Sequence, residues 1–412
     1  MHFNIKCREN AKLLNTQETL NTLSYELEEP KISYGFNELL NIQRNKIDKI
    51  NSDIWKKVRW YINDYDFLVK DPIINRAFYK FWEIINEFDI FENISEDDII
   101  YHCAEAPGGF IQGSNIYLQL DSVIPKSKDL PIVDQSGFTL VKRKRKTEPK
   151  KYKIFTISLN KDLPQYKSYN LPSYNKSILN KQILVTYGKD NTGDINNLEN
   201  VYYIKELSSR QNVNGFYLIT SDCGFDEKEE YNNKEQLHSL VIMNCIFNAI
   251  YLQKDDGNYI LKVFDIFTDT SIQLLYLLNT LYTEVYIYKP KTSRPSNSEK
   301  YVICKGFTKD TNYKNKVIIL LQELSNKCRK NSIKKYTVFK LFDNIPNSFI
   351  NKIKEMNTRL LKIQCQFLTN AITLCNDPTF SNNYDTQLQV SIEKRKTVFK
   401  EWEALYNLNV FV

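Results

Sequence analysis

The chain has 412 residues, of which 42% are hydrophobic and 25% are charged, and these ordinary values exclude a wholly disordered chain and a fibre. At about 150 residues per domain, the length predicts two to three domains, with enough chain to bury a core without disulfides or metal ions. Lysine and arginine outnumber aspartate and glutamate by 56 to 49, so the net charge of +7 is compatible with an anionic partner but does not require one.

Cysteine and histidine usage argues against a metal site. The eight cysteines form no CxxC pair and the three histidines are far apart in the sequence, so we expect reduced, buried thiols rather than a zinc site or a disulfide framework. The N-terminal residues lack the apolar stretch of a signal peptide, and no run of 18 apolar residues predicts a membrane span.

Two amphipathic helices are expected ahead of the first strand. Apolar side chains recur at helical spacing over residues 37–62 and again over 74–88. The pattern changes at 99–104, a short apolar run that predicts a strand and ends just before Pro-Gly-Gly at 107–109. A helix through Leu120 is expected to follow this loop.

Strands and helices alternate in the middle of the chain. Further strands are predicted at 152–158, 182–187, 216–221, 258–264, 284–288 and 300–305. Helical segments at 234–253 and 268–281 separate several of them, which predicts an α/β domain with a mostly parallel sheet. After about residue 308 the pattern is helical again, with apolar residues three or four positions apart from Ile353 to Leu374 and from Val398 to Leu405.

Five short segments carry residues suited to chemistry. Two adjacent glycines in the loop 106–110 would let backbone approach a ligand where a strand ends, although Pro-Gly-Gly is also a good turn sequence. The other segments are Ser-Asp-Cys-Gly at 221–224, Lys262 within an apolar strand, the polar loop 293–299 and the helical segment 75–80. A buried lysine is rare unless it is paired, so Lys262 lies at a strand end or beside carboxylates. Taken singly, each segment is better explained as a turn, a salt bridge or a helix cap.

Together and in this order, the segments resemble the FtsJ-like family of S-adenosylmethionine-dependent RNA 2′-O-ribose methyltransferases. The resemblance is strongest to the cap-specific branch, including the versions carried by large DNA viruses. It rests on NRAFYK (75–80), APGGF (106–110), TGDI (192–195), SDCGF (221–225), ILKVFD (260–265) and TSRPSNSEKYVICKG (292–306).

The resemblance covers roughly residues 70–308 and implies the fold. That segment would form a Rossmann-like methyltransferase domain, with a sheet that is mostly parallel and has an antiparallel last strand. Helical segments would flank it, an N-terminal extension at 1–69 and a C-terminal region at 309–412.

A Lys-Asp-Lys-Glu catalytic tetrad is also implied, and it falls on Lys80, Asp222, Lys262 and Glu299. A lysine can take a proton from a ribose 2′-hydroxyl at neutral pH only if the lysine pKa lies well below about 10.4. Burial and a second lysine lower a lysine pKa, whereas carboxylates raise it. We therefore expect Lys262 to be the base, with Lys80 as its cationic neighbour and the two acids orienting the lysines. This chemistry needs no metal ion.

The implied cofactor is S-adenosylmethionine. Its site would comprise the glycine loop and the TGDI segment, that is Ala106, Pro107, Gly108, Gly109, Phe110, Asp194 and Ile195. Asn297 and, more weakly, Asn232 match positions near the RNA substrate. Three positions depart from the family pattern: His102 stands where an acid is frequent, Glu105 where a small residue is frequent, and Cys223 where a glycine is usual.

The implied function is methylation of the ribose of the first transcribed nucleotide next to an mRNA cap. The alternatives are ribose methylation of ribosomal or transfer RNA, and a non-catalytic RNA-binding subunit with the same fold. Expected partners are capped mRNA and other capping enzymes, without a membrane. The expected location is the cytoplasm, in a viral factory or virion if the chain is viral, with the nucleus as the alternative.

A basic run, Lys-Arg-Lys-Arg-Lys at 142–146, lies between two predicted strands. It would contact an RNA backbone, act as a nuclear-import signal, or be a solvated loop. The sequence leaves these three interpretations open.

Overall fold

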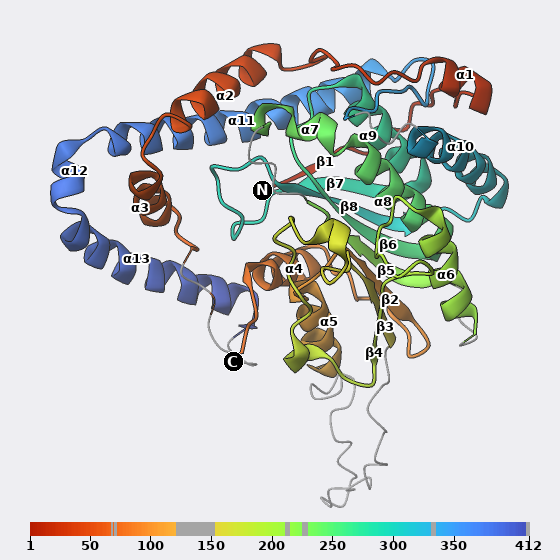
Figure 1. The fold of residues 1–412 in the computed structure, drawn as a ribbon, viewed down its shortest axis with the longest axis horizontal. Helices are drawn as coiled ribbons and strands as arrows, with labels where there is room; N and C mark the ends of the chain where they lie inside the picture. The colour runs from red at the N-terminus through yellow and green to blue at the C-terminus, as the bar shows by residue number, and fades with distance from the viewer. Residues whose placement is uncertain are drawn as a thin grey trace, which may run out of the picture.

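The computed structural model describes residues 1–66, 69, 72–120, 153–210, 215–224, 230–330 and 335–408. Within these residues, eight strands form a single sheet (Figure 1). In chain order they are β1 (His2–Asn4), β2 (Ile99–Cys103), β3 (Lys153–Ile157), β4 (Ile183–Thr186), β5 (Phe216–Ser221), β6 (Gln253–Val263), β7 (Tyr282–Tyr288) and β8 (Lys300–Phe307). In space the order is β1-β7-β8-β6-β5-β2-β3-β4.

The sheet is mostly parallel. The neighbouring strands β4, β3, β2, β5 and β6 run in one direction. The last strand, β8, lies between β6 and β7 and is antiparallel to both, and β1 pairs antiparallel with β7 at the edge. The Rossmann-like sheet with an antiparallel last strand is thus confirmed. The short β1 was not predicted, because three residues carry too little pattern to indicate a strand.

Helices cover both faces of the sheet. Successive strand residues point to opposite faces, so in β2 Tyr101 and Cys103 pack into the larger core and Ile100 into the smaller one. The larger core contains α6 (Leu198–Ser209), α8 (Ser239–Leu252), α9 (Asp269–Leu281) and α10 (Thr311–Lys330), and the smaller contains α4 (Arg76–Glu87) and α5 (Gly109–Leu120). Burial on both faces explains why the central strands are nearly continuous apolar runs.

The N- and C-terminal helices pack on one another beside the sheet. In Figure 1, α2 (Tyr34–Ile47) and α3 (Ser52–Ile62) lie near α11 (Asn347–Cys375), with which they share two small apolar clusters. The short α12 (Pro378–Asn382) leads into α13 (Tyr384–Leu405), whose end returns to α4. There Trp402 Nε1 donates to Glu83 Oε2 at 3.2 Å and Trp82 Nε1 donates to the carbonyl of Tyr406 at 3.0 Å. The C-terminal region therefore holds α4, the helix that carries Lys80.

Two segments that were each predicted as one continuous helix are divided in the structure. The predicted helix 37–62 is two helices, α2 and α3, because Asn51 caps the start of α3. The Asn51 side chain accepts from Asp53 N at 2.9 Å and from Ile54 N at 3.3 Å. The segment 234–253 is likewise divided into α7 (Lys234–Leu237) and α8. A further short helix, α1 (Thr16–Asn21), was not predicted. Domain boundaries at 69/70 and 308/309 stay a prediction. No helix among the described residues is both long enough and apolar enough to cross a bilayer.

Candidate active site

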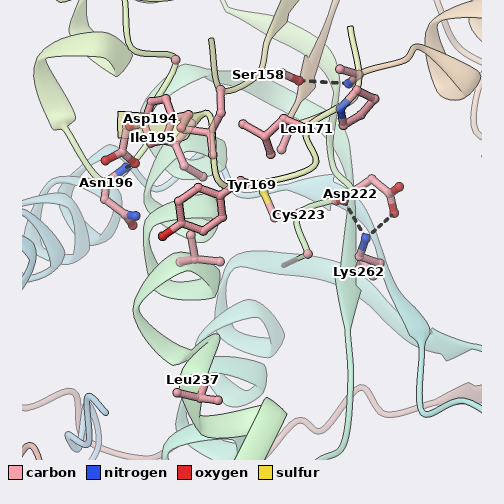
Figure 2. Close-up of a pocket in the computed structure, with 18 residues that line it drawn as sticks. Ser158, Tyr169, Leu171, Asp194, Ile195, Asn196, Asp222, Cys223, Leu237 and Lys262 are labelled. Carbon is pink, nitrogen blue, oxygen red and sulfur yellow. Dashed lines mark hydrogen bonds and ion pairs between the residues drawn. The ribbon is translucent and has the colours of Figure 1, made fainter. Parts of the chain in front are cut away.

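A pocket of about 650 Å³ opens at the carboxyl ends of the parallel strands (Figure 2). Its wall combines segments that follow β2, β3, β4 and β5 with residues of α7, α8 and β6, the last of these being Lys262. In an open α/β sheet this edge is where ligands bind, because the connections there diverge to either face. The lining residues are Ala104, Ala106, Ser158, Leu159, Tyr166, Tyr169, Leu171, Pro172, Gly193, Asp194, Ile195, Asn196, Asp222, Cys223, Gly224, Leu237, Val241 and Lys262.

The four residues of the expected tetrad form two mostly buried ion pairs. Lys262 Nζ lies 3.3 Å from Asp222 Oδ1 and donates to the Asp222 carbonyl at 2.7 Å. Lys80 Nζ lies 2.7 Å from Glu299 Oε1. Asp222 and Lys262 also line the pocket, so the pair is open to a bound ligand (Figure 2).

The electrostatics of the tetrad differ from the expectation in one respect. Burial lowers the pKa of Lys262, but the charges of Asp222 and Glu299 outweigh burial, and the net pKa is raised. Burial raises the pKa of Glu299, yet Lys80 and Lys262 together hold this pKa far below its ordinary value. In the protein alone, Lys262 is therefore a protonated ammonium group, and Lys80 forms an ion pair with Glu299.

Three residues that sequence reasoning missed orient the two acids. Tyr301 donates its hydroxyl to Asp222 Oδ1 at 3.0 Å, and Ser293 donates to Glu299 Oε1 at 2.9 Å. Lys289 Nζ donates to the Glu299 carbonyl at 2.8 Å and to Asn297 Oδ1 at 2.9 Å. Burial lowers the pKa of Lys289 to about 7, although Glu299 opposes the shift. Ser293 lies within the motif 292–306, but nothing in the sequence indicated which of its polar residues face the acids.

The glycine loop contributes less to the pocket wall than expected. Ala106 lines the pocket, whereas Pro107, Gly108, Gly109 and Phe110 are absent from its wall. A Cβ added to Gly109 would collide with Asn75 Oδ1 and lie 2.7 Å from Phe78 N, so this glycine lets α5 pack against the start of α4. Gly108 has a φ of +114°, a conformation that favours glycine, and Phe110 is buried and stacks on Phe81.

The TGDI segment lies in the pocket as expected. Asp194 and Ile195 both line it, and Asp194 Oδ1 accepts from Asn196 N at 2.9 Å. Burial raises the pKa of Asp194. Gly193 has a φ of +73°, and a Cβ there would collide with the carbonyl of Ser158, so only glycine lets the turn close against the segment after β3.

The two expected substrate residues lie outside the pocket wall. Asn297 accepts from Lys289, as described above, in the loop that precedes β8. Asn232 donates to Asn45 Oδ1 on α2 at 3.1 Å. The structure therefore places Asn297 beside Lys289 and Ser293, which both contact Glu299, but places Asn232 against the N-terminal helices.

The positions that depart from the family pattern have structural partners. His102 is fully buried between the hydroxyls of Thr220 at 2.7 Å and Ser114 at 3.0 Å, and burial lowers its pKa to about 3, so it is neutral. Glu105 Oε1 accepts from Phe110 N at 2.6 Å, which caps the start of α5. Burial, with Asp222 nearby, holds the pKa of Glu105 well above its ordinary value.

Two parts of the sequence predictions lie outside the described residues. These are the basic run 142–146 and Phe225 of the SDCGF segment. Their assignments stay predictions.

Comparisons with known proteins agree with the site. The model of the family "FtsJ-like methyltransferase" matches residues 73–307. Cap-specific mRNA (nucleoside-2′-O-)-methyltransferase 1A of Caenorhabditis briggsae is 30% identical over 188 residues, which is 44% of this chain and 21% of that protein. Cap-specific mRNA (nucleoside-2′-O-)-methyltransferase 2 of Drosophila melanogaster is 24% identical over 356 residues, 82% of this chain and 45% of that protein.

A third relative is named as inactive. It is the inactive cap-specific mRNA (nucleoside-2′-O-)-methyltransferase 1B of Caenorhabditis briggsae, 29% identical over 188 residues, 44% of this chain and 22% of that protein. This chain thus spans less than half the length of each of the three relatives. Because the family model matches more than half of the chain and the tetrad is assembled at the ligand edge of the sheet, the chain belongs to the FtsJ-like methyltransferase family.

Proposed function

We propose that the chain transfers the methyl group of S-adenosylmethionine to the ribose 2′-hydroxyl of the first transcribed nucleotide of capped mRNA. The observation that carries the proposal is the pair of buried lysine–carboxylate contacts at the pocket, Lys262 with Asp222 and Lys80 with Glu299. The names of two relatives supply the substrate class.

The pocket has the size and chemistry for S-adenosylmethionine. A volume of about 650 Å³ falls within the range of small-molecule sites. Leu159, Leu171 and Val241 give an apolar wall for a base, and the carboxylate of Asp194 can accept from ribose hydroxyls. Asp222 places a negative charge where a sulfonium would be stabilised. When bound, the cofactor supplies an electrophilic methyl group.

The residues of this chain then accept the proton of the 2′-hydroxyl and hold the nucleotide in place. Lys262 receives the hydrogen bond of the 2′-hydroxyl and holds its proton after transfer. For Lys262 to accept this proton, the pKa of Lys262 must fall in the complex. Exclusion of water from the pocket and the positive charge of the sulfonium beside Asp222 would both lower this pKa. Lys80 and Glu299 fix the position of the nucleotide next to the base, which removes the entropic cost of alignment from the reaction step.

The first experiment locates the methyl group. The chain is incubated with labelled S-adenosylmethionine and short RNAs that differ only in the presence of a cap, and the products are digested with nucleases. We expect label on the ribose of the first nucleotide of the capped RNA. Equal labelling of capped and uncapped RNA, or label on internal riboses of structured RNA, would favour ribosomal or transfer RNA methylation instead.

The non-catalytic alternative has a specific observation in its favour, because one relative is named as inactive. In this chain all four tetrad residues are present and paired, which supports activity. RNA binding without any methyl transfer would favour the non-catalytic role.

Further assignments are part of the same proposal. We infer that Pro107, Gly108, Gly109 and Phe110 support the cofactor site by holding Ala106 in the pocket wall. We also infer that Asn297 acts near the substrate. A viral origin rests on the sequence motifs, and other capping enzymes as partners and a cytoplasmic location follow from the proposed substrate. Co-purification of the chain with capping enzymes from its native source would test the partner assignment.

A further inference from the structure

Three cysteines meet behind the proposed catalytic aspartate. Cys103 ends β2, Cys223 directly follows Asp222, and Cys245 lies within α8. Their sulfur atoms all lie within 4.8 Å of one another, and Cys223 Sγ is 3.2 Å from Cys245 Sγ. From the sequence we expected reduced, buried thiols, and the cluster forms only because the fold brings the three segments together.

Only one of the three sulfurs has access from outside. Cys223 lines the pocket and is 8% exposed, whereas Cys103 and Cys245 are fully buried. Figure 2 shows the Cys223 side chain at the pocket, beside Asp222. A small molecule that enters the pocket therefore reaches Cys223 first, with the other two thiols directly behind it.

The spacing of Cys223 and Cys245 suits a disulfide better than a metal ion. Two thiolates on one tetrahedral zinc, each about 2.3 Å from the metal, lie about 3.8 Å apart. The observed 3.2 Å is shorter, and an approach of about 1.1 Å would give the disulfide bond length of about 2.05 Å. Oxidation of these two thiols to a disulfide would also add no charge to the buried cluster, whereas binding a metal ion would require all three cysteines to be thiolates.

The cluster contains its own base. Hydrogen bonds from Cys223 and Cys245 hold the pKa of Cys103 below its ordinary value, although burial opposes the shift. The hydrogen bond with Cys103 raises the pKa of Cys223. Because the three sulfur atoms lie within 4.8 Å of one another, the proton of Cys223 can pass to Cys103 at the moment Cys223 reacts.

We propose that Cys223 and Cys245 form a reversible disulfide when a peroxide enters the cofactor pocket. Cys223 loses its proton to Cys103, and its sulfur attacks one peroxide oxygen, which breaks the O–O bond, forms a sulfenic acid and, for hydrogen peroxide, releases hydroxide. The sulfur of Cys245 then attacks Cys223 Sγ, and the S–S bond forms as the S–O bond of the sulfenic acid breaks, so that its oxygen leaves with the Cys245 proton as water. The hydroxide takes up the proton held by Cys103 and becomes the second water. In sum, two thiols and one hydrogen peroxide give one disulfide and two waters.

Oxidation would act on the neighbouring site. Cys223 is adjacent to Asp222, whose carbonyl and carboxylate both contact Lys262 Nζ. A shift of about 1 Å in Cys223 would therefore misplace the proposed acid–base pair. This consequence for activity rests on the proposed function, whereas formation of the disulfide does not.

The test uses the full chain, hydrogen peroxide and peptide mass spectrometry after alkylation of free thiols. We expect two of the eight thiols to be lost, a Cys223–Cys245 cross-linked peptide, and full recovery of both thiols with dithiothreitol. S-adenosylhomocysteine at about 100 times its Kd, with binding checked by calorimetry, should slow the cross-link up to about 100-fold by covering Cys223.

Matched variants separate this chemistry from general oxidation. Cys245→Ala should abolish the cross-link and keep basal activity, because Cys245 lies behind the pocket wall. Cys375→Ala should leave the cross-link unchanged, since Cys375 is also 8% exposed but is the last residue of α11, where it packs with Val58 and Phe380.

The outcomes are distinct. Peroxide treatment that leaves Cys223 and Cys245 alkylated in the folded protein would overturn the proposal, as would a cross-link of Cys223 to Cys103 instead. A cross-link in a chain that methylates no RNA would leave the disulfide standing and refute the proposed function. Methyl transfer without any cross-link would do the reverse.

Discussion

Gly109→Ala should destabilise the protein by disturbing the contact between α5 and α4. An added Cβ would collide with Asn75 Oδ1 and lie 2.7 Å from Phe78 N, and the backbone atom cannot move without moving α4. Asn75 caps α4 through Ala77 N at 3.0 Å and Phe78 N at 3.3 Å, and loss of a cap costs about 1 kcal/mol. Overpacking adds about 1–3 kcal/mol, for a total of about 2–4 kcal/mol.

Differential scanning calorimetry measures the effect. At about 2–4 °C per kcal/mol for a domain of this size, Tm should fall by about 4–16 °C. Gly35→Ala on α2 is the matched control, because nothing lies within 4 Å of a Cβ there, and its Tm should stay within about 2 °C of the wild type. An equally small change for Gly109→Ala would refute the packing argument. Normal stability with lost cofactor binding would instead place Gly109 at the ligand.

Three other predictions concern the site, and a fourth concerns the basic run. Lys262→Arg should abolish methyl transfer while leaving cofactor affinity within a few-fold, because a guanidinium group does not release its proton at workable pH, and near-normal turnover would remove Lys262 from the role of base. Tyr301→Phe should lower kcat by about 10- to 100-fold, since a hydrogen bond to a charged group is worth about 1.5–3 kcal/mol, and an unchanged kcat would show that Asp222 needs no such support. Folding raises the pKa of Glu105, so the contribution of Glu105 to stability is complete below the unfolded pKa of about 4.3 and is lost as pH rises. In urea unfolding from pH 5 to pH 8, Glu105→Gln should therefore gain stability relative to the wild type. Unfolding free energies of the two proteins that change in parallel with pH would contradict this. Replacing all five residues of the basic run 142–146 with Ser or Gln should make the salt dependence of RNA affinity shallower by about 0.7 per phosphate contact on single strands, and identical slopes would exclude phosphate contact.

Much of the fold was predictable because local patterns carry it. Strands buried on both faces are continuous apolar runs, so most strand bounds were predicted within two residues, and the alternation with helices indicated the parallel sheet. The exception is β6, which begins at Gln253 and not at the predicted residue 258. The division of 37–62 was missed because both halves share one apolar periodicity and only the cap at Asn51 separates them. β1 was missed because its pairing with β7 depends on tertiary structure and not on local pattern.

The site was predictable only as far as the motif resemblance reaches. Lys80, Asp222, Lys262 and Glu299 were named from motifs, and the structure brings them together. Which groups orient the acids was not predictable, because Tyr301 and Lys289 lie in an apolar strand and at a strand end, where their sequence neighbours explain them equally well.

The packing role of Gly109 and the cluster of three thiols could not be predicted from the sequence. Gly109 is required by a helix that lies more than 30 positions earlier in the chain, and no local pattern records that contact. The thiols of Cys103, Cys223 and Cys245 are far apart in sequence and meet only through the sheet order.

Methyl transfer by a matched pair of lysine variants tests the central claim most directly. Lys262 and Lys254 lie on the same strand, and each pairs with a carboxylate, Asp222 at the pocket and Asp98 away from it. With capped RNA and labelled S-adenosylmethionine under single-turnover conditions, Lys262→Met should lose methyl transfer by a factor of at least about 100 while Lys254→Met stays within a few-fold of the wild type. Equal rates for the two variants, with both proteins folded and binding the cofactor, would contradict the assignment of this pocket and tetrad as the active site.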